Sequence, residues 1–295
     1  MTHILLALMR GAHYLPLGLL RACGRLLGGV LYRLAPQRRR VAQANIDACL
    51  PELAAPARHA LVRQTFCVFG QGFLDRAILW HASAERIRAL VRLEGASHLA
   101  ALAGRPVILL APHFAGLDAA WSRLSLDSRL VTIYANQKDP LFNAALLAGR
   151  RRFNDPLLLS RQEGVREALR ALKQGLPLYY LPDMDLGARD AIFVPFFGIP
   201  AATVTAVSRL ARMSGATILP CIATMTNTGY TVTIHPPWQD YPGASIEADT
   251  LRMNAFIEHM VQAAPAQYHW LHKRFKTRPA GAAPLYPSQP EPAPR

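Results

Sequence analysis

Short apolar runs alternate with longer amphipathic stretches along most of the chain. The run Val107–Leu110 is apolar at all four positions, which is typical of a buried strand. Further strands are predicted over residues 129–136, 176–181, 217–223 and 230–234, and helices over residues 37–50, 56–80, 83–103, 140–153, 163–174, 203–215 and 246–264. Strands that alternate with helices predict an α/β fold with a mostly parallel central sheet flanked by helices.

The N-terminal stretch is apolar but interrupted by arginines. Between Arg10 and Arg21 it has ten uncharged residues, whereas a helix that spans a bilayer needs ~20. Arg10, Arg21 and Arg25 fall on one face of a helical wheel, a pattern typical of an interfacial membrane anchor. The alternatives are a helix packed on the domain with its arginines outward, and a tilted span with the arginines at 38–40 on the cytoplasmic side.

Proline marks both predicted segment boundaries. Pro36 ends the apolar stretch, so residues 1–35 are predicted to form a membrane-anchoring helix and residues 36–279 the main domain. Six prolines between 279 and 294 predict a disordered tail over residues 280–295.

The charge balance narrows the possible partners. The formal net charge is +14, and the first 40 residues carry seven arginines and no acid. Such a chain favours an acidic partner, which could be nucleic acid, anionic lipid, a phosphorylated substrate or an acidic protein. With 51% apolar and only 18% charged residues, a lipid habitat is indicated. The four cysteines form no CxxC pair, and their spacing fits neither a zinc site nor a disulfide framework.

The first candidate for chemistry follows the strand at Val107–Leu110. His113 comes directly after Ala-Pro, and Asp118 lies five residues later. Ligands usually sit at the ends of buried strands in α/β sheets. A carboxylate can hold one imidazole nitrogen so that the other takes a proton. The alternative is a structural histidine near a surface aspartate.

Three further polar groups have both a structural and a functional interpretation. Asp183 and Asp185 could bind a metal or a sugar hydroxyl, or they could serve as turn residues before Gly187. Arginines at a helix C-terminus complement the helix dipole, but they could also clamp phosphate; the candidates are Arg150 and Arg152. Lys273 and Arg274 could form a solvated face or hold an anionic headgroup.

Several enzyme and binding classes lack their motifs. The chain has no Gly-x-Ser-x-Gly elbow, no Gly-x-Gly-x-x-Gly turn, no P-loop and no histidine-rich metal spacing. Nucleic-acid binding would fit the charge, but the sequence has no recognised module.

The segment His113-Phe-Ala-Gly-Leu-Asp118 resembles the HxxxxD/E signature of the glycerolipid and lysophospholipid acyltransferases. More narrowly, the chain resembles the late (secondary) acyltransferases of lipid A biosynthesis, a lauroyl/myristoyl transferase type. This resemblance covers roughly residues 5–279 and rests on five blocks in order, at residues 111–118, 149–153, 180–187, 193–198 and 268–279.

The resemblance implies a glycerolipid acyltransferase-like fold, with residues 36–279 as the acyltransferase domain. It implies O-acyl transfer from acyl carrier protein to a hydroxyacyl chain of a lipid A precursor, a phosphorylated disaccharide lipid, at the cytoplasmic face of the inner membrane of a Gram-negative cell. Inner-membrane lipids are implied partners, while no cofactor, metal or nucleic acid is expected.

In that interpretation His113 is the general base and Asp118 its orienting group. Arg150 or Arg152 would bind an acceptor phosphate or the developing oxyanion, with backbone N–H groups after Pro112 as other oxyanion donors. Asp183 and Asp185 would order the site or contact the sugar, and Lys273 and Arg274 would hold a headgroup. The alternatives are an acyltransferase for a lysophospholipid or aminolipid acceptor, and a non-catalytic basic protein that binds lipid or nucleic acid.

Overall fold

The computed structural model of the protein describes residues 1–161 and 164–286. A seven-stranded sheet forms its centre, in the order β1-β9-β8-β2-β5-β3-β4. The strands are β1 (Val91–Glu94), β2 (Val107–Leu110), β3 (Val131–Tyr134), β4 (Leu157–Ser160), β5 (Leu178–Tyr180), β8 (Thr217–Thr226) and β9 (Gly229–Ile234). Only β8 and β9 pair antiparallel among these strands. The predicted α/β fold with a mostly parallel sheet is confirmed.

Both faces of this sheet are covered. Along β2, Ile108 and Leu110 belong to one buried hydrophobic cluster, and Val107 and Leu109 to another, because successive side chains of a strand point to opposite faces. This is why β2 reads as an unbroken apolar run. The helices around the sheet are α5 (Ala84–Leu90), α6 (Ala96–Ala100), α7 (Leu117–Leu124), α8 (Pro140–Arg150), α9 (Gly164–Lys173), α10 (Ala206–Ser214) and α11 (Ile246–Ala263).

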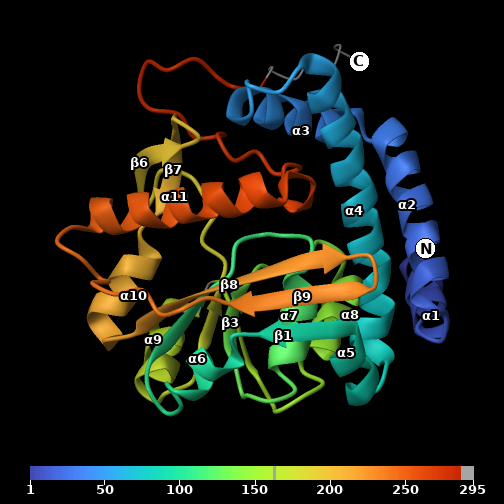
Figure 1. Cartoon of the computed structure of the whole chain (residues 1–295), viewed down its shortest axis with the longest axis horizontal. Coiled ribbons are helices and arrows are strands. Elements are labelled where there is room, and N and C mark those ends of the chain that lie inside the picture. Colours follow the sequence, from blue (N-terminus) through green and yellow to red (C-terminus); the bar gives the residue numbers. More distant parts are fainter. Residues whose placement is uncertain (162–163, 287–295) are drawn as a thin grey trace.

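Strand β1 and the hairpin of β6 (Ala191–Phe196) and β7 (Ile199–Val204) were not predicted from the sequence. Residues 83–103 do not form one helical stretch, because β1 lies between α5 and α6 and pairs parallel with β9. The apolar segment near residue 195 is half of this separate hairpin, which lies beside α11 (Figure 1). Its turn residues Phe197 and Gly198 both have positive φ, 51° and 72°, as a tight two-residue hairpin turn requires.

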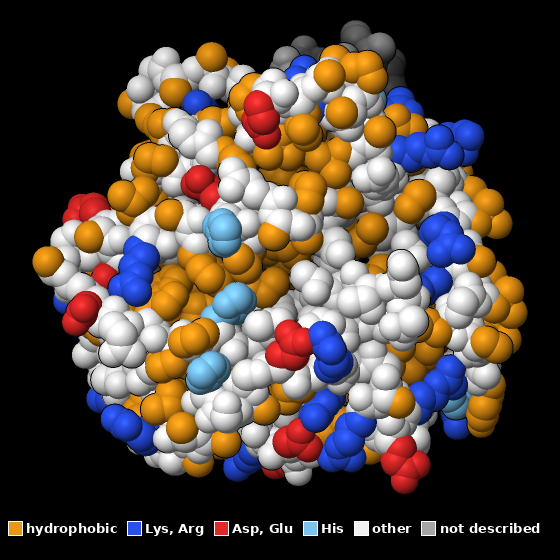
Figure 2. Space-filling view, viewed as in Figure 1, with side chains coloured by type: hydrophobic (Ala, Val, Ile, Leu, Met, Phe, Trp, Pro, Cys, Tyr) orange, Lys and Arg blue, Asp and Glu red, His pale blue; other side chains and the backbone are white. Residues whose placement is uncertain are grey.

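The N-terminal region forms two helices instead of the single helix predicted for residues 1–35. These are α1 (Thr2–Ala12) and α2 (Leu17–Leu34), followed by α3 (Pro36–Cys49) and the long α4 (Ala55–His81). Figure 2 shows hydrophobic and basic side chains interspersed along the right edge of the molecule, over α1 and α2. No helix in the described ranges is long and apolar enough to cross a membrane.

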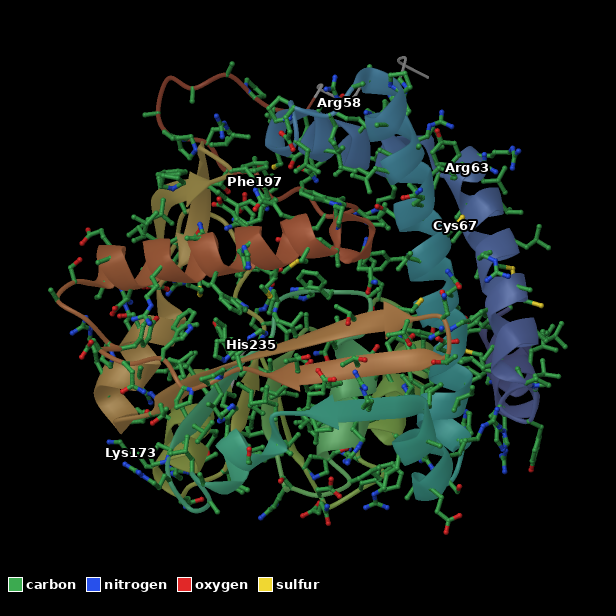
Figure 3. All side chains as sticks on the ribbon, viewed as in Figure 1. Arg58, Arg63, Cys67, Lys173, Phe197 and His235 are labelled. Atoms are coloured by element: carbon green, nitrogen blue, oxygen red, sulfur yellow. The ribbon has the colours of Figure 1, made fainter. Side chains whose placement is uncertain are left out.

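Helix α2 lies unusually close to α4. A Cβ added at Gly28 would come within 2.4 Å of the Phe66 carbonyl oxygen, and one at Gly70 within 2.4 Å of the Gly24 carbonyl oxygen. Small residues spaced four apart let two helix backbones approach in this way. On the same interface Cys67 of α4 faces α2 (Figure 3), and its thiol donates to the Arg25 carbonyl at 3.7 Å.

Arg21 does not join the basic face expected on the helical wheel. It is only 4% exposed, its Nε lies 3.2 Å from Asp75 Oδ2, and its guanidinium also donates to the carbonyls of Thr226 and Gly229. Tyr230 donates its hydroxyl to the same Asp75 oxygen at 2.6 Å. A buried ion pair therefore links α2 to α4 and to the β8–β9 hairpin.

The first part of the predicted tail packs against the domain. Tyr286 is buried, accepts a hydrogen bond from Phe275 N at 3.0 Å and donates one to Asn45 Oδ1 at 2.6 Å. Residues 280–286 are thus part of the fold, and the rest of the predicted tail, residues 287–295, lies outside the described residues.

Candidate active site

The centre of the site is built by two neighbouring strands. β2 and β5 run parallel with Leu110 opposite Tyr180, and the ladder extends one step further through Ala111 N, which donates to Tyr180 O at 2.9 Å. After each of these two strands a proline, Pro112 or Pro182, is followed by a polar residue. His113 and Asp183 therefore stand three residues beyond paired positions, at the same edge of the sheet.

These two side chains contact each other directly. His113 Nδ1 lies 2.7 Å from Asp183 Oδ1, and the backbone N–H of His113 donates to Asp183 Oδ2 at 3.0 Å. The Asp183 side chain is 2% exposed and that of His113 is 20% exposed. A carboxylate at Nδ1 selects the tautomer in which Nδ1 carries the proton and Nε2 is free to accept one.

Asp183 is held as an anion. Burial alone would raise the pKa of its carboxyl, but the nearby His113 and its two hydrogen bonds outweigh burial and lower the pKa to about 2. Asp183 therefore stays ionised throughout the neutral range, where it stabilises positive charge on the imidazole.

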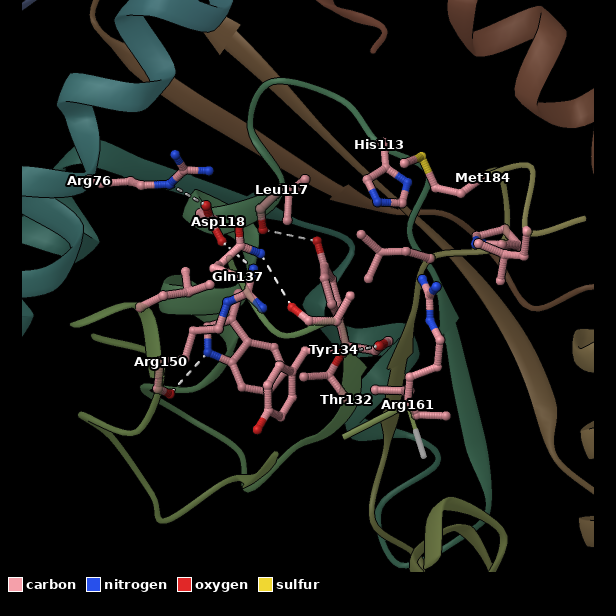
Figure 4. A pocket seen from close by; sticks show the side chains of 18 of the residues that line it. Arg76, His113, Leu117, Asp118, Thr132, Tyr134, Gln137, Arg150, Arg161 and Met184 are labelled. Atoms are coloured by element: carbon pink, nitrogen blue, oxygen red, sulfur yellow. Dashed lines mark hydrogen bonds and ion pairs between the residues drawn. The ribbon is translucent and has the colours of Figure 1, made fainter. Parts of the chain in front are cut away.

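The predicted pairing of His113 with Asp118 is wrong. Asp118 begins the first turn of α7, and its two carboxylate oxygens accept from Arg76 Nε at 2.7 Å and from Arg150 at 2.8 Å (Figure 4). Burial would raise the pKa of Asp118, but the two guanidinium groups hold it well below its usual range. The spacing of five residues suggested a local pair, whereas the sheet register places Asp183 against the histidine.

His113, Asp118 and Arg150 all line one cavity of about 330 Å³. Its walls also include Arg76 of α4 and Arg161, which follows β4. The remaining lining is largely apolar and aromatic, with Leu117, Trp121, Ile133, Tyr134, Phe142, Leu146, Tyr179, Leu181, Pro182, Met184, Leu186 and Val204 among it. An apolar cavity with a few convergent polar groups is the usual form of a small-molecule site.

Possible donors to an oxyanion can now be compared. Beyond Pro112, the backbone N–H groups of His113, Ala115 and Leu117 already donate to Asp183, to Gln267 O and to Phe114 O. By contrast, Arg150 Nε is buried and has no hydrogen-bond partner among the described residues. That atom has almost no accessible surface, so it is the rest of the Arg150 side chain, 17% exposed, that lines the cavity and can contact a bound group.

Arg152 and Asp185 do not reach the cavity. Arg152 donates to the carbonyls of Leu79 and Ala82 at 2.8 and 2.6 Å, which satisfies the end of α4. Asp185 is buried, and its carboxylate accepts from Gly187 N, Thr277 N and the Thr277 hydroxyl. Both side chains therefore have structural contacts, and neither lines the cavity of His113.

The basic residues near the C-terminus are also structural. Arg274 is 2% exposed and donates at 2.8 Å to Ala202 O and to the Thr203 hydroxyl of β7. The Lys273 ammonium lies 5.5 Å from the centre of the Tyr286 ring. Neither residue lines the cavity that contains His113, and the headgroup contact stays a prediction.

The sequence analysis missed Arg76 and two histidines. His269 lies beside the site, with its ring centre 6.1 Å from that of His113; burial first, and then the neighbouring His113, lower its pKa to about 3. His272 Nε2 accepts from Asp185 N at 3.0 Å. A charged pair, Asp75-Arg76, inside the apolar helix at 56–80 was the available signal for Arg76.

The sequence matches a known protein family. The sequence profile of the family described as "Bacterial lipid A biosynthesis acyltransferase" matches residues 1–277. The chain belongs to this family. Membership confirms the resemblance seen in the five sequence blocks, and it makes the protein an acyltransferase of lipid A biosynthesis.

Relatives in this acyltransferase family align over most of the chain. The Escherichia coli (strain K12) lipid A biosynthesis lauroyltransferase is 31% identical over 90% of this chain and 87% of its own length. The palmitoleoyltransferase of the same organism is 29% identical over 92% and 90%, and the myristoyltransferase 31% over 86% and 80%. Among solved structures, the 1-acyl-sn-glycerophosphate acyltransferase PlsC of Thermotoga maritima aligns at 14% identity with a TM-score of 0.42, over 82% of this chain and 98% of that chain.

Proposed function

We propose that this acyltransferase moves a fatty acyl chain from an acyl carrier protein thioester to a hydroxyacyl chain of a lipid A precursor, at the cytoplasmic face of the inner membrane. The observation that carries the proposal is the His113–Asp183 pair at the wall of an apolar cavity that also holds Arg76, Arg150 and Arg161. A general base, an apolar space for a chain and cations for an anionic acceptor are the parts that this reaction needs.

The chemical step uses His113 as the base. Nε2 removes the proton from the acceptor hydroxyl while its oxygen attacks the thioester carbonyl, and no covalent enzyme intermediate is needed. The C–O ester bond forms, the C–S bond breaks, and the leaving thiolate takes the proton from the imidazolium. Asp183 stabilises the imidazolium through Nδ1. General-base assistance of this kind contributes on the order of 10²–10⁴ in rate.

Arg150 supplies the positive charge near the reacting atoms. The exposed part of its guanidinium, which lines the cavity, is available to the oxyanion or to an acceptor phosphate. Asp118, placed between Arg76 and Arg150, fixes both guanidinium groups. In this mechanism Asp118 is a positioning residue for the arginines, and preorganised charge is often the largest contribution to rate.

A second cavity gives the donor a route. It has a volume of about 500 Å³ and shares Ile133, Arg161, Leu181, Leu186 and Val204 with the cavity of His113. Arg161, Arg189 and Arg209 lie on its lining with one carboxylate, Asp190, which pairs with Arg189 at 3.8 Å and with Arg209 at 3.4 Å. The exposed apolar side chains of Val165 and Met213 line it as well. Cations around an apolar opening suit an acidic carrier protein whose acyl-bearing arm enters toward His113.

The N-terminal helices supply a membrane-binding surface. Large apolar side chains are exposed on α1 and α2, at Ile4, Leu8, Leu19, Leu26, Val30, Leu31 and Leu34, and basic side chains lie among them (Figure 2). Such a surface lies on a bilayer through apolar burial, and each basic residue near anionic lipid adds about 1 kcal/mol.

Mass spectrometry of lipid A tests this proposal. A strain that lacks the protein should lose one acyl chain from its lipid A, wild-type protein should restore it, and His113→Ala should not. The purified enzyme should prefer an acyl carrier protein thioester to acyl-CoA. Unchanged lipid A in the deletion strain, together with acylation of a lysophospholipid by the purified enzyme, would favour the alternative acceptor.

A further inference from the structure

A separate groove lies on the other side of α8 from the active-site cavity. Helix α8 turns Leu146 and Arg150 to the cavity of His113, whereas Ala145, Ala148 and Gly149 line an open groove of about 530 Å³. The opposite wall comes from Leu6 and Ala7 of α1, and the floor includes Trp80. Apart from its charged residues, the groove is lined by apolar side chains.

Close packing sets the floor of this groove. A Cβ at Gly149 would lie 2.4 Å from Trp80 Cδ1, so the glycine lets α8 rest directly on the indole ring. The ring is 5% exposed. The floor is therefore closely packed, and the two walls carry the small side chains of Ala7, Ala145 and Ala148 together with Leu6.

Basic side chains gather in the same groove. Arg10, His81 and Arg152 line it, and Arg152 is held in place by its bonds to Leu79 O and Ala82 O. Burial lowers the pKa of His81, and the charges that lower it further belong to His13, Arg152 and Arg10. At neutral pH the positive charge of the groove therefore comes from Arg10 and Arg152, and a bound anion would offset it.

We propose that this groove binds one anionic phospholipid of the bilayer. Its phosphate contacts Arg10, His81 and Arg152, and one acyl chain lies between α1 and α8. Charge complementarity and the apolar walls both favour such an amphiphile. The groove also borders α1, where Ile4 and Leu8 are each 66% exposed, so a lipid can enter from the membrane surface.

The bound phospholipid is not a substrate in this proposal. Helix α8 separates the groove from His113, because the residues that line the two spaces lie on different sides of that helix. The lipid instead holds α1 against α8 at the membrane. This role goes beyond acyl transfer and does not depend on which donor or acceptor the enzyme uses.

Native mass spectrometry of the full chain in neutral detergent tests the proposal. Dioleoylphosphatidylglycerol or dioleoylphosphatidylcholine is added, and the retained lipid is counted. We expect one phosphatidylglycerol per protein, retained about tenfold better than phosphatidylcholine, a ratio that one well-placed charge interaction can supply. Arg10→Glu should abolish the preference by reversing the charge, and Ala148→Phe should abolish retention by filling the groove.

Arg33→Glu is the matched control, because Arg33 is an exposed arginine of α2 that does not line the groove. It should retain phosphatidylglycerol like wild type. Equal loss in Arg10→Glu and Arg33→Glu, with retention in Ala148→Phe, would overturn the site in favour of a diffuse basic surface. Retention of a phosphorylated glucosamine lipid in preference to phosphatidylglycerol would also overturn it. Lipid-free melting temperatures check that each variant is folded.

Discussion

Two adjacent residues of α4, Asp75 and Arg76, form ion pairs in two different regions of the molecule, the α2–α4 interface and the active site. Asp75 pairs with Arg21 of α2 in a sealed interface, while Arg76 pairs with Asp118 at the wall of the active-site cavity. Burial raises the pKa of Asp75 despite Tyr230 and Arg21. It fails to raise the pKa of Asp118, because two guanidinium groups contact that carboxylate.

The two regions differ in their access to a cavity and in the number of guanidinium groups that contact the carboxylate. The interface has one guanidinium for its carboxylate, and the two side chains are only 4% and 0% exposed, so their charges hold the helices together. The active site has two guanidinium groups that contact Asp118, and both belong to side chains that line an open cavity. An excess of fixed positive charge beside an open space is what a reaction with developing negative charge requires.

The largest effect should come from the histidine–carboxylate pair. His113→Ala and Asp183→Asn should each lower the transfer rate on the order of 10²–10⁴, since the first removes the base and the second its orienting anion. Asp118→Asn should instead lower both activity and thermal stability, because it weakens two ion pairs. Transfer rates and melting temperatures measured together separate the roles. Full activity in Asp183→Asn would return the orienting role to Asp118.

The next effect should be on stability alone. Arg21→Met leaves Asp75 buried without its guanidinium, and breaking a buried pair in this way costs about 3–5 kcal/mol of unfolding free energy. Transfer by the folded fraction should persist. Denaturant unfolding in detergent measures this loss, with exposed Arg33→Met as the control. An unchanged unfolding midpoint would show that the pair adds no net stability.

Acid pH should destabilise the protein through His269. The pKa of His269 is about 3 in the folded protein and has its ordinary value of 6.5 in the unfolded chain. The contribution of neutral His269 to the free energy of unfolding is therefore complete above pH 6.5 and is lost as the pH falls toward 3. At pH 5 the loss should be roughly 1–2 kcal/mol. His269→Gln should flatten the pH dependence of the melting temperature, while exposed His59→Gln should not. A parallel decline in both variants and wild type would contradict this assignment.

The smallest effect should come from a surface ion pair. Arg88 and Asp127 lie 3.0 Å apart, with side chains 48% and 45% exposed. Arg88→Ala should change the unfolding free energy by less than about 1 kcal/mol, because water screens such pairs. The same unfolding assay provides the measurement. A loss as large as that of Arg21→Met would remove burial as the reason for the difference between the regions.

Local sequence patterns predicted the helices and strands better than they predicted which side chains interact. The apolar run of β2 and the histidine after it followed from the sequence, as did α11 and the β8–β9 strands. β1 was missed because its four residues lie directly after α5, without a break. Arg150 and Arg152 are two residues apart near the end of α8, so they point to different sides, and the sequence did not show which side was the cavity.

Side-chain pairs that form only in the tertiary structure could not be predicted from local sequence patterns. His113 lies 70 positions from Asp183, and only the register of β2 against β5 brings the two together. On a helical wheel Arg21 falls on the basic face, but in the fold it is buried and pairs with Asp75, which lies 54 positions away. The glycines at 24 and 28 were the readable sign that α2 packs tightly on another helix.

The shared register at Leu110 and Tyr180 also limits which length changes the chain can tolerate. One residue inserted at 111–112 or at 181–182 would displace one partner of the His113–Asp183 pair relative to the other. Compensation would require an equal insertion after the neighbouring strand. Loop grafting or indel libraries that avoid these two dipeptides should therefore yield active enzymes far more often than libraries that include them.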